Sequence, residues 1–159
     1  MTQEEWLCDY IEHAFKDVQL RDGRTIHHAQ SSEEYGNCHE LELAQWAERK
    51  DWRRIPAKIL LDRPNAITFL DAESFRFYLP ALMTIIIKDR DIDGWFVDSV
   101  MFNLNVDSKG KIDGVLFRSL FSVHQKAAIV CFLKYMIHNR RGFASCHDEK
   151  ILARVQTRT

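Results

Sequence analysis

The sequence predicts an all-α protein that folds as one irregular helical bundle. Amphipathic segments with helix-capping residues at their starts recur along the chain, and no segment reads as a firm strand. The segment 69–87, FLDAESFRFYLPALMTIII, is in addition apolar on nearly every side. A helix that is hydrophobic all round belongs in the interior of a protein. We therefore expect a central apolar helix, bent at Pro80, around which the other helices pack.

The first helix is expected directly after Thr2. Thr2 and Glu5 have the spacing of a capping box, in which each side chain bonds the backbone N–H of the other residue. Apolar residues then recur at helical spacing and predict one buried face. The residues of this face are Trp6, Leu7, Tyr10, Ile11, Ala14, Phe15 and Val18.

The next segments predict short helices. Residues 25–35 are polar and weakly patterned, so we expect at most a short helix that ends at Gly36. Asn37 is placed to cap the following helix. The residues of that helix expected to face inward are Leu43, Trp46 and Ala47. Pro56 cannot continue a helix but can open one, which predicts a short helix over Ala57–Leu61.

The central segment is expected to become helical after Asp71, which is placed to cap it. Pro80 removes one backbone hydrogen bond and clashes with the carbonyl four residues earlier. This predicts either one kinked helix or two consecutive helices, over 72–78 and 80–88. In both arrangements the apolar residues on the two sides of the proline face the same core.

The stretch that follows allows two interpretations. Its apolar residues between 97 and 104 are spaced by three and four, which favours a helix. Residues 102–106 also alternate between apolar and polar, so a β-hairpin over 102–117 with a turn at 107–110 is the alternative. After it, Ser122 and Gln125 have capping-box spacing and start a helix. A last helix is expected from Ser145.

Composition describes an ordinary water-soluble globule. The 159 residues fit one domain, 1–159, and 46% are hydrophobic and 28% charged. No apolar run reaches the roughly 18 residues that a membrane span needs. The acidic, amphipathic N-terminus is neither a secretory signal nor a transit peptide. We therefore expect a cytoplasmic protein, not bound to a membrane, whose four cysteines are free thiols.

Charge is distributed unevenly. Residues 1–50 hold 11 acidic and 5 basic residues, a net charge of −6, whereas 111–159 hold 3 acidic and 9 basic residues, a net charge of +6. The two ends either complement each other or face solvent, or the basic end meets an acidic partner. The overall charge of −1, with no basic run longer than Arg140 and Arg141, argues against nucleic-acid binding.

Two blocks of the chain resemble a known signature. Trp52-Arg53-Arg54-Ile55-Pro56 and the later FLDAESFRFYLPA, residues 69–81, resemble an uncharacterised bacterial family, a domain of unknown function with W-x-x-I-P and F-L-D-x-E-x-F-R-F-Y-L-P-A blocks. The likeness covers roughly residues 51–135. It implies that 97–105 is helical, and it implies no activity, cofactor or partner.

Two groups of residues were considered as metal ligands. Asp89, Asp91 and Asp93, followed by Gly94, match the opening of a calcium loop, but Val100 stands where the loop needs a bidentate Glu. A solvated acidic loop is therefore the favoured interpretation, with a metal site as the alternative. The second group is two adjacent Cys-His pairs, Cys38-His39 and Cys146-His147. Paired zinc ligands normally stand two to four residues apart, which these do not.

Arg76 is the most informative polar residue, because it lies in an apolar helix between Phe75 and Phe77. If it is buried, it needs a carboxylate partner. The acidic residues considered for that role are Asp71, Glu73 and Asp98. The alternative is an arginine at a groove that binds an anionic ligand or a partner, with the Tyr78 hydroxyl at the same place.

Two hypotheses for function follow. No nucleophile elbow, phosphate loop or dinucleotide fingerprint is present, which favours a non-enzymatic protein-interaction module of the immunity or antitoxin kind, with a protein partner and no cofactor. The alternative is a metal-dependent hydrolase of unrecognised type, acting through the three aspartates or the Cys-His pairs.

Overall fold

A computed structural model describes residues 1–105, 111–112, 114–139 and 145–157 of the chain. In chain order the elements are α1 (Gln3–Phe15), α2 (Ile26–Glu33), α3 (Cys38–Ala44), η1 (Trp52–Arg54), α4 (Ala57–Leu61), η2 (Asn65–Phe69), α5 (Ala72–Lys88), α6 (Gly94–Leu104), β1 (Lys111–Ile112), β2 (Val115–Leu116), α7 (Phe117–Leu120), α8 (Val123–Asn139) and α9 (Ser145–Thr157). The fold is all-α, as expected, and η1 and η2 are short 3₁₀ turns. None of the helices described is long and apolar enough to cross a bilayer.

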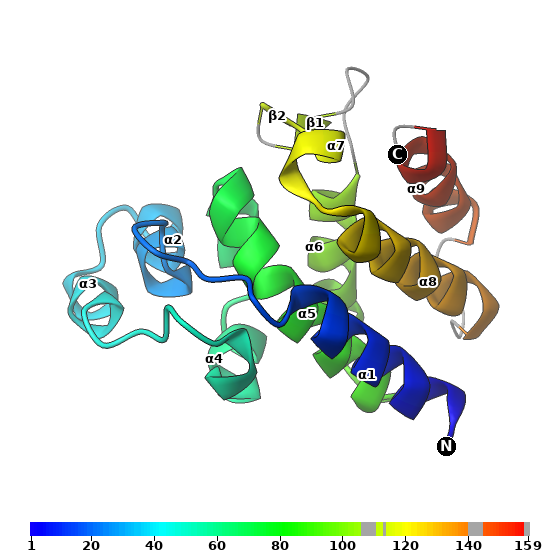
Figure 1. Cartoon of the computed structure of the whole chain (residues 1–159). Coiled ribbons are helices and arrows are strands. Elements are labelled where there is room, and N and C mark those ends of the chain that lie inside the picture. Colours follow the sequence, from blue (N-terminus) through cyan, green and yellow to red (C-terminus); the bar gives the residue numbers. More distant parts are fainter. Residues whose placement is uncertain (106–110, 113, 140–144, 158–159) are drawn as a thin grey trace.

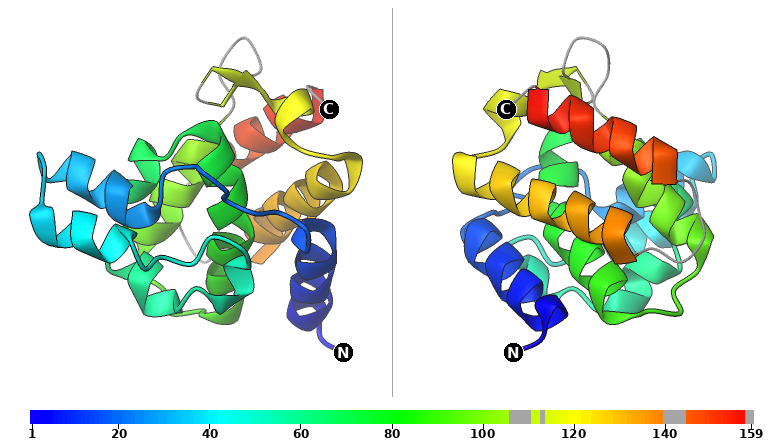
Figure 2. Two further views of the ribbon diagram at one scale, coloured as in Figure 1. Left: turned by 60° about the vertical axis from the view of Figure 1, so that its left-hand side comes forward. Right: turned by 90° about the vertical axis from the view of Figure 1, so that its right-hand side faces the viewer.

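Helix α5 is the central element. It contacts α1, η1, α4, α6 and α7. Figure 1 shows it between two groups of helices, α2 to α4 on one side and α1, α8 and α9 on the other. In the views of Figure 2, α9 lies alongside α8 on the outer side of the second group. The predicted arrangement, with an apolar helix enclosed by the others, is therefore confirmed.

The central helix is continuous through its proline. Asp71 caps it as predicted, by accepting the N–H of Ser74 at 2.8 Å, and the helix then runs without a break to Lys88. The alternative of two consecutive helices is therefore wrong. Twelve of its seventeen residues are buried, Pro80 among them. Burial of these twelve side chains against several neighbouring elements stabilises the helix, so it tolerates the backbone hydrogen bond that Pro80 cannot donate.

Helix α1 begins with the predicted capping box. The N–H of Glu5 donates to the Thr2 hydroxyl at 3.1 Å, and the N–H of Thr2 donates to the Glu5 carboxylate at 2.7 Å. The inner residues of its apolar face, such as Ile11, are buried. Trp6 is half-exposed, however, and stacks on Tyr10. The predicted face is therefore right for the inner residues and too wide at Trp6.

The short helices α2, α3 and α4 begin and end near the capping and helix-breaking residues predicted from the sequence. Asn37 caps α3 by accepting the N–H groups of His39 and Glu40, and α4 occupies the expected residues. The expectation for Trp46 is wrong, because α3 ends at Ala44 and the helical spacing no longer applies beyond it. Trp46 is 82% exposed.

A buried polar network joins these short helices. His27 of α2 hydrogen-bonds Glu40 of α3 at 2.7 Å, and Arg63, which follows α4, pairs with the same carboxylate at 2.8 Å. Burial alone would raise the pKa of Glu40, but the hydrogen bonds from Arg63 and His27 outweigh it and hold that pKa below its ordinary value. A charged Glu40 therefore links α2, α3 and the end of α4.

The stretch 97–104 is helical, as part of α6, so the favoured interpretation is confirmed and the alternative, a hairpin of 102–106 with 112–117, is wrong. A shorter antiparallel ribbon is present instead, in which Lys111 pairs with Leu116 and Ile112 with Val115. The turn expected at 107–110 lies outside the described residues. Ser122 and Gln125 form the predicted capping box, with bonds of 3.0 and 3.2 Å.

Candidate functional site

Arg76 is partly buried and is bonded within the chain. Its guanidinium pairs with Glu73 at 2.8 Å, one of the three acids considered for it, and donates to the Leu120 carbonyl at 3.2 Å. It lies on the wall of an open hollow near the start of α5. Two of its nitrogens therefore hold α5 to α7 and to its own first turn, which is a structural role.

Tyr78 does not share a surface with Arg76. It is 1% exposed, and its hydroxyl accepts the backbone N–H of Ile26 at 2.9 Å. Burial raises the pKa of Tyr78 to about 12. Its hydroxyl thus satisfies one of the unpaired N–H groups at the start of α2, and a ligand at the surface does not reach it.

The three aspartates considered as metal ligands act locally. Asp89 follows α5 and accepts the N–H of Asp91, whereas Asp93 caps α6 by accepting the N–H of Trp95. In the part of the chain that the structure describes, no three His, Cys, Asp or Glu residues are grouped so as to hold a metal ion. The side chains of Cys146 and His147 lie outside that part. The described residues therefore supply no supporting geometry for the metal-dependent hydrolase.

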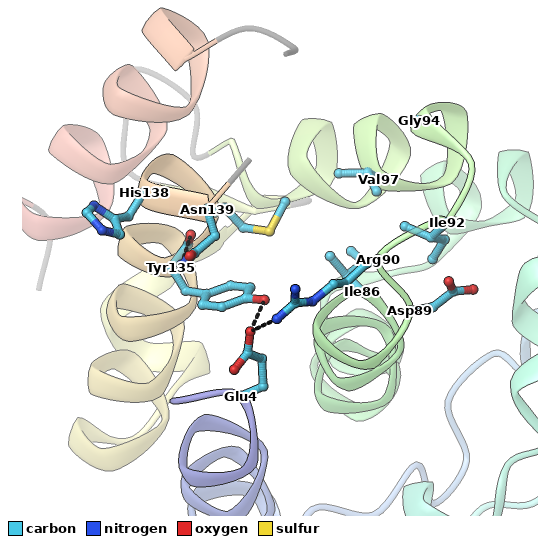
Figure 3. A pocket seen from close by; sticks show the side chains of 11 residues that line it. Glu4, Ile86, Asp89, Arg90, Ile92, Gly94, Val97, Tyr135, His138 and Asn139 are labelled. Carbon is cyan, nitrogen blue, oxygen red and sulfur yellow. Dashed lines mark hydrogen bonds and ion pairs between the residues drawn. The ribbon is translucent and has the colours of Figure 1, made fainter. Parts of the chain in front are cut away.

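A pocket of about 420 Å³ opens where the ends of α1, α5, α6 and α8 meet (Figure 3). Arg90 reaches from the loop after α5 to Glu4 in the first turn of α1, at 2.8 Å. Tyr135 of α8 donates to the same carboxylate oxygen at 3.4 Å. In Figure 3 His138 points away from this group, so the imidazole does not join it.

The chemistry of this pocket is that of an ion pair. A hydrogen bond from its own backbone N–H, and then one from Arg90, lower the pKa of Glu4. Burial, and then the Glu4 charge, raise the pKa of Tyr135. A general acid or base works best with a pKa near the operating pH, and both groups are moved away from neutrality. The contacts of Glu4 therefore join the first turn of α1, the loop after α5 and the last turns of α8.

The most unusual surface lies elsewhere, on the outer side of α6. Asp98, Ser99 and Phe102 stand three, four and seven positions after Trp95, so the four residues share one face. Trp95 is 61% exposed and Phe102 is 62% exposed. The opposite face of the same helix is buried and includes Phe96, Val97, Val100, Met101 and Leu104. Helix α6 therefore carries large apolar side chains on its solvent face as well as on its core face.

Further exposed aromatic residues face this stripe. Phe69 of η2 and Tyr35, which follows α2, line the same open groove of about 560 Å³. The Trp95 indole donates to Asn65 of η2 at 2.9 Å, which fixes the orientation of that ring. We call this groove, lined by Glu33, Tyr35, Asn65, Thr68, Phe69, Trp95, Asp98, Ser99 and Phe102, the aromatic groove.

Tyr35 is held in an unfavourable backbone conformation. It has a φ of 57°, and the N–H groups of Tyr35 and Gly36 bond back to Ser32 and Ser31 in the manner of a Schellman motif. That position normally carries Gly, because other residues pay a steric penalty there. The Tyr35 side chain is 99% exposed and so offers little compensating contact within the chain. Folding therefore gains little from this side chain.

The aromatic groove was missed by reasoning from the sequence. Periodicity assigned the residues near Trp95 to a helix, but an exposed aromatic stripe and a buried one have the same spacing. The sequence did contain one signal for an exposed aromatic face. Helix α6 has aromatic residues on two opposite faces, and only one of these faces can be buried against the core.

The fold and these surfaces define a small all-α protein with an exposed aromatic groove. Its residues 3–151 match a family of unknown function (DUF6714), and the chain belongs to this family. Comparison with curated proteins found no match, and comparison with solved structures found none either. The family resemblance seen in the sequence is thus confirmed as membership of an uncharacterised family.

Proposed function

We propose that this protein is a non-enzymatic interaction module that binds a partner protein through the aromatic groove. The single observation that carries the proposal is the exposure of Trp95 and Phe102 on one face of α6, opposite Phe69 and Tyr35. Single exposed apolar residues are normal on a protein surface, but a cluster of large aromatic side chains marks interaction sites. Aromatic residues are also enriched among the residues that dominate binding energy.

Two further features support a binding role. The groove is partly pre-organised, because the Trp95 ring is held by Asn65 before any partner arrives. Pre-organisation reduces the entropy lost on binding. The positive φ of Tyr35 costs stability, as expected of a residue kept for a function other than folding.

The proposal also covers the cellular compartment and the kind of partner. We propose a cytoplasmic protein of a bacterial cell, and the described free thiols of Cys8, Cys38 and Cys131 fit a reducing compartment. An immunity-like or antitoxin-like role, in which this chain holds one other protein, would use the same groove.

The proposal is tested by comparative affinity capture from a lysate of the cells that naturally produce the protein. The baits are wild type, the double variant Trp95→Ser with Phe102→Ser, and the control Trp46→Ser. Trp46 is an even more exposed tryptophan that lies outside the groove lining. Circular dichroism establishes that all three baits are folded.

We expect the wild type and the Trp46→Ser bait to recover the same partner protein in equal amounts. With the double variant, the yield of that protein should fall at least about tenfold, which corresponds to loss of a binding hot spot worth about 1.4 kcal/mol or more. Recovery of the same proteins in the same amounts by all three baits would refute the proposal.

A further inference from the structure

The aromatic groove also carries acidic side chains. Glu33 and Asp98 are on its wall, and the groove-lining residues in the described part of the chain include no Lys, Arg or His. The hydrogen bonds that Glu33 accepts come from neutral amides, Gln30 at 3.2 Å and Asn65 at 3.5 Å. Its negative charge therefore persists beside the aromatic rings.

Aromatic faces and a carboxylate together recognise cations. A ring of Trp, Tyr or Phe attracts a Lys or Arg head group through its quadrupole, most strongly for Trp. The planar guanidinium of Arg also stacks on aromatic rings and donates hydrogen bonds from its edge to a carboxylate. A neutral apolar occupant would use the rings but not Glu33, and an anionic occupant would be repelled by it.

We infer that the aromatic groove receives a basic side chain, arginine or lysine, of the partner protein, with the cation over the Trp95 and Phe102 rings and beside Glu33. This inference rests on the proposed function and adds the chemistry of what the partner presents. Asn65 joins the carboxylate to the indole ring, because its amide nitrogen donates to Glu33 at 3.5 Å and its amide oxygen accepts the Trp95 indole N–H at 2.9 Å. A cation above the Trp95 ring is therefore close to a negative charge, which favours a basic side chain over a neutral one.

The inference is tested with two synthetic peptides. The probe is acetyl-Leu-Arg-Leu-amide, and its control has citrulline in place of arginine, which keeps the shape and removes the charge. Binding is followed by NMR through the indole N–H signals of the chain's four tryptophans, assigned by Trp→Phe variants. The signals of Trp6 and Trp46 serve as internal controls, because neither residue lines the groove.

We expect the arginine peptide to shift the Trp95 indole signal saturably and to leave the Trp6 and Trp46 signals in place. At equal concentration, the citrulline peptide should shift the Trp95 indole signal at least about threefold less. Glu33→Gln should reduce the affinity for the arginine peptide by about threefold, as for loss of one exposed ion pair. Added salt should reduce the binding. Phe102→Ala should weaken it while the indole spectrum of the folded protein is kept.

Equal responses to the two peptides, or the absence of any saturable shift at Trp95, would overturn the inference. So would self-association in sedimentation that Phe102→Ala abolishes, because a second copy would then occupy the groove. The two proposals fail separately. A partner captured through the groove without preference for the arginine peptide contradicts only the charge assignment, whereas capture independent of the groove contradicts the proposed function.

Discussion

The hydroxyl of Tyr78, in the middle of the central helix, accepts the backbone N–H of Ile26, the first residue of α2, at 2.9 Å. Trp52 makes a parallel link, because its indole donates to the carbonyl of Phe15 at the end of α1. Both residues belong to the two blocks that resemble the family signature. Each of these two buried aromatic side chains is hydrogen-bonded to the backbone at a helix end, so both residues have a structural role.

Tyr78→Phe tests the first of these links. The variant keeps the ring and leaves the buried N–H of Ile26 without its acceptor, which we expect to lower the free energy of unfolding by roughly 1–3 kcal/mol. Urea denaturation measures the change. Tyr10→Phe is the control, because Tyr10 is only partly buried and should change the stability little. Equal stabilities of the two variants would show that the Tyr78 hydroxyl is not needed.

The contrast between core and groove is tested by two Phe→Ala substitutions. Phe75 of α5 is fully buried, so Phe75→Ala should cost roughly 3–5 kcal/mol of unfolding free energy. Phe102 is largely exposed, so Phe102→Ala should change that free energy by less than about 1 kcal/mol. Thermal melts of both variants decide the matter. A large loss for Phe102→Ala would mean that its ring serves the fold rather than a partner.

Tyr35→Gly is expected to increase stability. Glycine adopts positive φ without a steric penalty, so the substitution should raise the unfolding free energy by about 1 kcal/mol. Tyr35→Ala removes the same ring but keeps the penalty, and it should give no such gain. Chemical denaturation of both variants measures the difference. If the glycine variant is no more stable than the alanine variant, then the backbone at Tyr35 is not strained.

The buried network predicts a dependence on pH. The folded-state pKa of Glu40 lies below its ordinary value of 4.5, so its contribution to stability is present above that pH and is lost as the pH falls through the folded pKa. The unfolding free energy of the wild type should therefore fall more steeply between about pH 5 and about pH 3 than that of Glu40→Gln. Denaturation midpoints across this range provide the measurement. Parallel curves for the two proteins would show that the pKa of Glu40 is not lowered by folding.

At neutral pH the same variant should be strongly destabilised. Removing the carboxylate leaves the partly buried Arg63 without its counter-charge, which we expect to cost roughly 1–3 kcal/mol. Lys58→Gln is a suitable control, since Lys58 forms only an exposed pair with Asp62. A Glu40→Gln protein as stable as the control would mean that the network contributes little.

Local signals in the sequence were sufficient for most of the fold. The capping residues Thr2, Asn37, Asp71 and Ser122 each start the expected helix, because capping depends on hydrogen bonds between near neighbours in the chain. The apolar pattern of α5 was enough to place it at the centre.

What the sequence could not supply depends on contacts between distant segments. His27, Glu40 and Arg63 are separated by 13 and 23 residues, and no pattern joins them. The exposure of Trp46 and Trp95 was missed for the same reason, since periodicity identifies a helix face but not what covers it. Of the predicted site residues, Arg76 is paired with Glu73 and the Leu120 carbonyl within the chain and Tyr78 is buried, so the candidate groove emerged only from the structure.

The most direct test of the account is site-specific photo-crosslinking in the cells that naturally produce the protein. A photoreactive p-benzoylphenylalanine replaces Phe102 in one sample and Trp46 in the other, two exposed aromatic positions of which only the first lines the groove. We predict a discrete covalent adduct with another protein from position 102 and none from position 46. No adduct at position 102, or the same adducts at both positions, would contradict the proposal that the aromatic groove is the binding surface.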